Sequence, residues 1–233
     1  MKILFLLQLV LVSLFASSLE QALAAFKAKS YTEAFALYQE EAVKGNVEAQ
    51  NALSYLYFNG LGTDTDTEKG KEWLTKAALQ ADPSAQFDLG IMYLFGENLE
   101  QNYTEAAFWL ERAADLGHSQ AQYNLALMYY QGDGVDQNIT KTAKYLEISA
   151  KNGNKKAQRL VGRILLQTLE MDGAIHWLQI NADNGDSEAS YLLAEVYCSN
   201  QQYDKAAPLI DAAITSGEDK AKQLKLTCKA EEL

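Results

Sequence analysis

The sequence predicts an all-α protein, a right-handed α/α superhelical solenoid built from stacked pairs of short helices. Three observations lead to this fold class. The 233-residue chain has only two prolines and lacks alternating runs of β-branched residues, which favours helices throughout. Small and apolar residues recur at a constant spacing along most of the chain. Glycines lie where the helices of that repeat should end, because glycine adopts a left-handed conformation without strain.

The first helix of each predicted pair follows a period of 36 residues. In residues 49–57 it carries an alanine, a leucine and a tyrosine at four-residue intervals, which places them on one helix face. The matching positions are Ala49, Leu53, Tyr57, Ala85, Leu89, Tyr93, Ala121, Leu125, Tyr129, Ala157 and Val161. A pair of helices this short cannot bury that face alone, so the pairs must stack on one another.

The second helix of each pair keeps the same period. It carries an aromatic residue followed by alanine, where the alanine allows close approach of helices and the ring fills the space beside it. The matching positions are Trp73, Trp109, Tyr145, Ala78, Ala114 and Ala150. Glycines close both helices of the pair, at Gly60, Gly96, Gly132, Gly117 and Gly153, with Ala81 in the remaining place.

Two stretches carry a resemblance to a known family. They are AQFDLGIMYLFGENLEQNYTEAAFWLERAADLG and AQYNLALMYYQGDGVDQNITKTAKYLEISAKNG, which resemble Sel-1-like repeats, relatives of tetratricopeptide repeats. Three regular repeats are predicted over residues 49–156, preceded by a degenerate helix pair over 25–48. After Ala157 the period falls to 32 residues, so 157–217 are interpreted as two shortened repeats and 218–233 as a capping helix.

The N-terminus has the pattern of a cleaved signal peptide. Lys2 precedes an apolar run over residues 3–16, which is shorter than the roughly 20 residues that span a bilayer. Ala22 and Ala24 form an A-x-A cleavage motif, which predicts removal of residues 1–24; cleavage after Ser18 is the alternative. We therefore expect a periplasmic or secreted protein without a stable membrane span.

The chemistry of the sequence indicates binding rather than catalysis. A net charge of −11 disfavours nucleic acid as a partner. Neither a nucleophile motif nor a metal-binding motif occurs, and no cofactor is expected. Asp64, Asp66 and Glu68 could suggest calcium, but Lys69 and Thr75 stand where an EF-hand loop needs glycine and glutamate. No metal site is therefore predicted.

The resemblance to tetratricopeptide stacks implies that the first helices line a groove for a partner. By register, the predicted groove residues are Asn51, Tyr55, Phe58, Phe87, Ile91, Leu94, Phe95, Tyr123, Leu127, Tyr130, Arg159 and Arg163. Aromatic residues and arginine are common in interface hot spots. An apolar groove with a basic end would suit an acidic and apolar peptide. Phe87, Ile91, Tyr123 and Leu127 also suit helix packing, so their role stays open between packing and binding.

Cys198 and Cys228 are predicted to lie near the ends of neighbouring helices, where an oxidising compartment would let them form a disulfide. The predicted function is a monomeric scaffold or adaptor for a protein or peptide of the bacterial envelope. An immunity protein that neutralises a toxic enzyme is the alternative. An enzyme acting on cell-wall or β-lactam substrates comes last, because the acid–base and nucleophile residues are missing.

Overall fold

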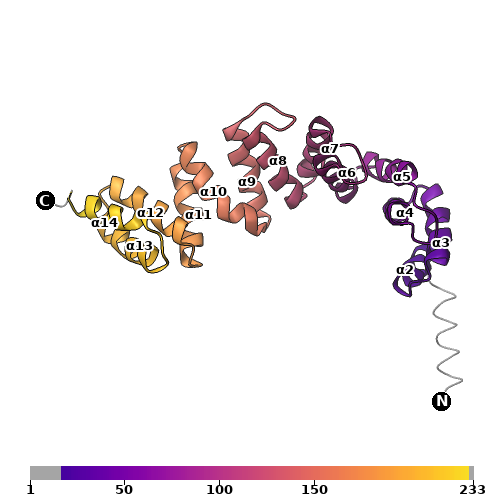
Figure 1. Ribbon diagram of the computed structural model, residues 1–233, viewed down its shortest axis with the longest axis horizontal. Helices are drawn as coiled ribbons and strands as arrows, with labels where there is room; N and C mark the ends of the chain where they lie inside the picture. The colour runs from indigo at the N-terminus through magenta and orange to yellow at the C-terminus, as the bar shows by residue number, and fades with distance from the viewer. Residues whose placement is uncertain (1–16, 231–233) are drawn as a thin grey trace, which may run out of the picture. The chain divides into compact units, whose positions relative to one another are not determined.

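The computed structural model describes residues 17–230, and within that range the chain is all-α. Thirteen helices and no strand occur among these residues, which confirms the predicted fold class of an all-α repeat protein. The chain divides into two compact units, one ending at His118 and the other beginning at Ser119. In each unit the helices contact chiefly their neighbours in chain order (Figure 1).

The first unit contains three helix pairs. These are α2 (Ser18–Lys27) with α3 (Tyr31–Val43), α4 (Val47–Asn59) with α5 (Thr67–Leu79), and α6 (Pro83–Phe95) with α7 (Tyr103–Asp115). The second unit contains α8 (Ser119–Gln131) with α9 (Ile139–Lys151), α10 (Lys155–Gln167) with α11 (Met171–Asp183), α12 (Ser187–Ser199) with α13 (Tyr203–Thr215), and the last helix α14 (Lys220–Ala230).

The first helix pair begins earlier than the sequence predicted. The degenerate repeat was placed at residues 25–48, but α2 starts at Ser18 and packs against α3. The predicted signal peptide, residues 1–24, therefore overlaps most of α2, and its residues 1–16 lie outside the described range. Ala22 belongs both to the A-x-A motif and to the buried face of α2, so the sequence motif alone could not separate the two roles.

A small residue in each first helix lets the second helix approach closely. The register contains Ser54, Gly90, Ala126, Gly162 and Ala194, and the opposing residues are Leu74, Leu110, Leu146, Leu178 and Ile210. A Cβ atom on Gly90 would lie 2.6 Å from Leu110 Cγ, and one on Gly162 would lie 2.8 Å from Leu178 Cγ. The leucines are fully buried, so the close approach forms the core of each pair.

A second register of buried glutamines joins successive repeats. The Gln50 and Gln86 side chains donate through Nε2 to the carbonyl oxygens of Ala42 and Ala78, at 3.1 and 2.9 Å. Gln80 in turn donates to Gln50 Oε1 at 2.7 Å, which satisfies both ends of the Gln50 amide. Leu116 stands where Gln80 would recur, and Gln86 Oε1 is buried without a hydrogen-bond partner. The hydrogen bonds of the glutamine side chain are thus complete at Gln50, whereas Gln86 lacks the bond to its Oε1 atom.

Candidate functional site

The candidate site is the exposed side of the first helices, considered separately in each unit. In the first unit, Tyr55 of α4 and Phe95 of α6 keep 53% and 60% of their surface exposed. The Tyr55 ring contacts the Phe26 ring of α2 edge-on, with centroids 6.1 Å apart. Ile91 and Leu94 are half-buried on α6. Large apolar side chains are therefore available to a partner on both α4 and α6.

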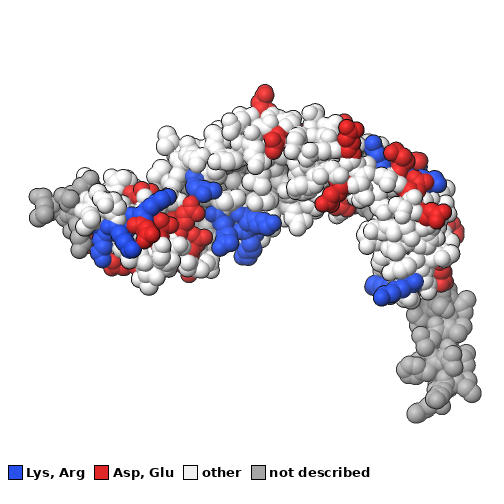
Figure 2. Space-filling view, in the orientation of Figure 1, with Lys and Arg blue, Asp and Glu red and all other residues white. Residues whose placement is uncertain are grey.

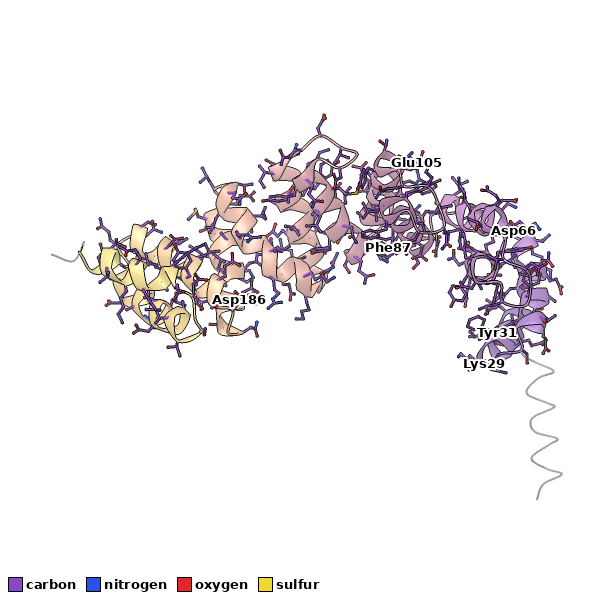
Figure 3. The ribbon with its side chains drawn as sticks, viewed as in Figure 1. Lys29, Tyr31, Asp66, Phe87, Glu105 and Asp186 are labelled. Atoms are coloured by element: carbon purple, nitrogen blue, oxygen red, sulfur yellow. A yellow bond between two sulfur atoms is a disulfide. The ribbon has the colours of Figure 1, made fainter. Side chains whose placement is uncertain are left out.

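Three other predicted residues of this unit have internal contacts. Phe58 lies against Gly70 of α5, where a Cβ atom would come within 2.8 Å of the Phe58 ring. Phe87, labelled on α6 in Figure 3, stacks on His118 with ring centroids 4.4 Å apart. Asn51 donates to Asp82 Oδ1 at 3.0 Å, while its own Oδ1 is buried without a partner. The Phe58 ring is half-buried and packs in the interface of its own helix pair, so it has a packing role.

In the second unit, one α8 residue of the predicted groove, Tyr130, lines a hollow. Tyr130 keeps 42% of its surface exposed, while Tyr123 and Leu127 are half-buried. A hollow of about 560 Å³ is lined by Tyr130, Gln137, Ile139 and Gln167. Gln137 donates to the Tyr130 carbonyl oxygen at 2.7 Å and so fixes the loop at the mouth of this hollow. Burial raises the pKa of the Tyr123 hydroxyl above its ordinary value, which keeps it neutral.

At the predicted basic end of the groove, both arginines lie near carboxylates. Arg163 Nη1 lies 3.1 Å from Glu188 Oε1, and Arg159 Nε lies 3.8 Å from Asp186 Oδ2. Figure 2 shows blue and red side chains next to one another over the C-terminal helices. Sequence reasoning missed these pairs because both carboxylates belong to the start of α12, more than twenty residues further along the chain. Each of the two predicted arginines therefore already has a carboxylate neighbour on the protein itself.

A second hollow, also missed from the sequence, lies between α10, α12 and α14. It measures about 410 Å³, and its lining is largely apolar. The lining residues are Leu166, Leu192, Glu195, Val196, Cys198, Ser199, Leu224, Thr227 and Cys228. The repeat register could have indicated it, because Leu166 follows Tyr130 by 36 residues and Glu195 follows Arg163 by 32. Tyr191 donates to Glu195 beside this hollow, and burial, with Glu195 as a further cause, raises the pKa of Tyr191 to about 12.

A disulfide forms one wall of this second hollow. Cys198 of α12 is bonded to Cys228 of α14, and both side chains are buried. The last helix is thereby joined covalently to the first helix of the preceding pair. The pairing is the one expected from the sequence.

Both histidines of the described range contact aromatic rings. His118 stacks on Phe87, and burial lowers its pKa against the opposing effect of Asp82. His176 contacts Trp177 edge-on. No group of three or more His, Cys, Asp and Glu side chains among residues 17–230 is arranged to hold a metal ion. Within the same range, no helix is long and apolar enough to cross a membrane.

The family comparison matches the middle of the chain. The Sel1 repeat model matches residues 47–82, 83–118 and 119–154, which correspond to α4–α5, α6–α7 and α8–α9. A comparison with curated proteins gives no match.

Two solved structures, a Sel1 repeat protein and YrrB, share the fold. A Sel1 repeat protein from Oxalobacter formigenes is 28% identical, with a TM-score of 0.63, over 88% of this chain and 85% of its own. YrrB, described as a TPR protein with an unusual peptide-binding site, is 21% identical, with a TM-score of 0.54, over 87% of this chain and 100% of its own. A protective antigen of uropathogenic Escherichia coli with an SLR fold is 25% identical, with a TM-score of 0.47, over 88% of this chain and 55% of its own.

Repeats of this class commonly act as scaffolds for protein interaction and are typically non-catalytic. The period, the helix pairs and the family model agree with the resemblance found in the sequence. The chain therefore contains three Sel1 repeats, and these lie inside a longer run of helix pairs.

Proposed function

We propose that the protein is a non-catalytic scaffold that binds an extended segment of a partner protein along the exposed side of its first helices. The observation that carries this proposal is the exposure of Tyr55 and Phe95 on α4 and α6, the successive first helices of the first unit. In the second unit, Tyr130 is exposed on the first helix α8. Each repeat already has a buried core built from other positions, so these rings are not needed to close it. Aromatic side chains of this kind bury 150–250 Å² each in an interface and often dominate its free energy.

The hollow beside Leu166 supports a segment that carries a large apolar side chain. The one beside Tyr130 and the one beside Leu166 both open on first helices of the second unit. Each has the volume of a small ligand pocket, and the second is largely apolar. Since Arg159 and Arg163 already pair with carboxylates, the partner segment needs no acidic character. The net charge of −11 would instead attract a basic partner over longer distances.

We further propose that the protein acts as a monomer in the periplasm or outside the cell. The Lys2 and apolar 3–16 pattern supports export. The Cys198–Cys228 disulfide supports an oxidising compartment, where such bonds persist. Light scattering of the purified protein would check the monomeric state, and cell fractionation would check the compartment.

Photo-crosslinking tests the binding surface directly. A benzophenone amino acid placed at Phe95 or Tyr130 should crosslink one and the same partner protein in cells. The matched control is Leu79, which is 65% exposed but lies at the end of a second helix. Crosslinking from Leu79 and none from Phe95 or Tyr130 would place the interface elsewhere.

Affinity for the crosslinked partner gives the second measurement. Tyr130→Ala should weaken binding by about tenfold, as for an interface residue worth more than 1 kcal/mol, while leaving the melting temperature nearly unchanged because the ring is exposed. Leu79→Ala should change neither quantity. Equal affinity of the Tyr130 variant and the wild type would reject this residue as part of the site.

A further inference from the structure

The structure makes α2 an integral part of the folded first unit. Ala22 and Ala25 are buried in the same cluster as Tyr38 of α3 and Leu53 of α4. Leu19 packs against the edge of that cluster. The apolar side of α2 therefore contributes to the core that closes the first helix pair. A mature chain that lacks α2 would expose this core to water.

The end of α2 is fixed by aromatic contacts. The Phe26 ring lies edge-on to Tyr31 of α3, with centroids 5.6 Å apart, and edge-on to Tyr55 of α4 at 6.1 Å. The chain then turns through residues 28–30, where the Ser30 N–H donates to the Ala25 carbonyl oxygen at 2.9 Å. The position of Tyr55, one of the proposed binding residues, thus depends on an intact α2.

The two cleavage sites in the sequence have opposite consequences for this helix. Cleavage after Ala24 would leave only residues 25–27 of α2, which is less than one helical turn. The buried Ala22 and the packed Leu19 would be lost with the leader. Cleavage after Ser18 would leave residues 19–27, which include every buried residue of α2.

Cleavage after Ser18 removes the cap at the start of the helix and the hydrogen bond between Ser18 and Glu41 of α3, but no buried residue of α2. Ser17 caps α2 by accepting from the Glu20 N–H at 3.2 Å, and the Glu20 side chain accepts from the Ser17 N–H at 2.8 Å. These two bonds are exposed, and their loss frays one end without opening the core. In the sequence, Ala16 and Ser18 supply the small residues of a peptidase motif directly after the apolar run.

We propose that signal peptidase cuts the exported chain after Ser18, so that the mature protein begins at Leu19 with α2 in place. The proposal rests on the export proposed above. Signal peptidase acts on the chain before it folds, so the Ala16-Ser17-Ser18 motif is accessible at that stage. Ala22 of the Ala22-Leu23-Ala24 motif is explained by packing, because it is buried in the core that α2 shares with α3.

N-terminal sequencing and intact mass of the full chain, expressed with its own leader and a C-terminal tag in a Gram-negative host, would test the site. The expected mature protein starts Leu19-Glu20-Gln21 and is recovered from the periplasm or medium. A start at Ala25-Phe26-Lys27 would overturn the cleavage proposal while leaving export intact. Uncut protein that stays in the cytoplasm would overturn export itself.

A matched pair of variants sharpens the result. Ser18→Leu places a large residue at the proposed cleavage position and should make the precursor accumulate. Ala24→Leu is the control, because Ala24 is exposed on α2 and its replacement leaves the core unchanged. Normal processing of Ser18→Leu together with blocked processing of Ala24→Leu would move the site to Ala24.

A folding measurement completes the test without any leader. Chains 19–233 and 25–233, produced without residues 1–18 or 1–24, are compared by thermal unfolding. The shorter chain should melt at a clearly lower temperature, since it lacks Leu19 and Ala22. Equal melting temperatures would show that α2 contributes nothing to the first unit and would remove the argument for Ser18.

Discussion

Helix pairs of two kinds occur in this protein, and they differ in the loop that joins their two helices. The long-loop pairs are α4–α5, α6–α7 and α8–α9, joined by residues 60–66, 96–102 and 132–138. The short-loop pairs are α2–α3, α10–α11 and α12–α13, joined by residues 28–30, 168–170 and 200–202. The core registers continue through both kinds. Similar helix packing is therefore compatible with two different solutions for the connecting backbone.

The long loops satisfy their backbone groups locally. Each begins with a glycine in the left-handed region and ends with Asp66, Asn102 or Asn138, whose side chain caps the second helix. The N–H of that capping residue also donates back to the tyrosine carbonyl of the first helix, at 2.8 to 3.0 Å in the three loops. Each loop is thus closed on both sides by hydrogen bonds.

The short loops place residues other than glycine in the left-handed region. These residues are Lys29, Leu169 and Gln201, with φ between 57° and 61°. The helices that follow have no side-chain cap. A left-handed residue with a side chain costs roughly 1–2 kcal/mol. The comparison indicates that short-loop pairs carry local strain which packing, and in the last pair a disulfide, must offset.

Removal of the disulfide should cause the largest loss of unfolding free energy. It would show how much the stability of the last short-loop pair depends on this bond. The bond joins cysteines with a sequence separation of 30. The double variant Cys198→Ser with Cys228→Ser should lose about 3–4 kcal/mol of unfolding free energy in the second unit, because the unfolded chain gains entropy. Urea unfolding followed by circular dichroism would measure it. Reductant should lower the wild-type midpoint and leave that of the variant unchanged; a variant as stable as the oxidised wild type would contradict the expectation.

A variant in a long loop can introduce the left-handed strain that the short loops carry, by replacing a glycine with a residue that has a side chain. Gly132 has φ of +84°, and a Cβ atom there would meet its nearest neighbour at 3.6 Å, which is an ordinary contact. Gly132→Ala therefore tests backbone strain without steric overlap. We expect a loss of about 1–2 kcal/mol in unfolding free energy. An unchanged urea midpoint would mean that long loops tolerate the strain that short loops already carry.

The helix caps should give a smaller difference in unfolding free energy between the two kinds of pair. Asn138 accepts from the Lys141 N–H at 2.9 Å, so Asn138→Ala should cost about 1 kcal/mol of unfolding free energy. Gln202 holds the matching position before α13 but makes no side-chain cap. Gln202→Ala is the control and should stay within about 0.5 kcal/mol of the wild type. Equal losses in the two variants would remove capping as a difference between the pairs.

The smallest expected effect is a gain in stability. Leu169 has φ of 61° and is 80% exposed, so its side chain contributes little packing. Leu169→Gly should relieve the left-handed strain, partly offset by the greater chain entropy of glycine, for a net gain of about 0.5 kcal/mol. Differential scanning calorimetry should show a slightly higher melting temperature. A decrease would show that the short loop is not strained at this residue.

The sequence predicted the fold well because its signals are local and repeated. The shortening of the period after Ala157 corresponds to the change from long to short loops. Tertiary contacts were harder to predict. The carboxylates that pair with Arg159 and Arg163 lie on α12, and the packing of Phe58 on Gly70 depends on the geometry between helices. The start of α2 was missed because Ala22, which packs in the core, also belongs to a peptidase motif.

Each helix contacts chiefly its neighbours in the chain. Repeats can therefore be added or removed without changing the rest of the sequence. A duplicate of residues 47–82 inserted after Asp82 would bring a complete long-loop pair whose registers match those on both sides. It would also add one further first helix with its own exposed tyrosine. If the proposed binding surface is correct, the number of repeats would set the length of the partner segment that the protein can bind.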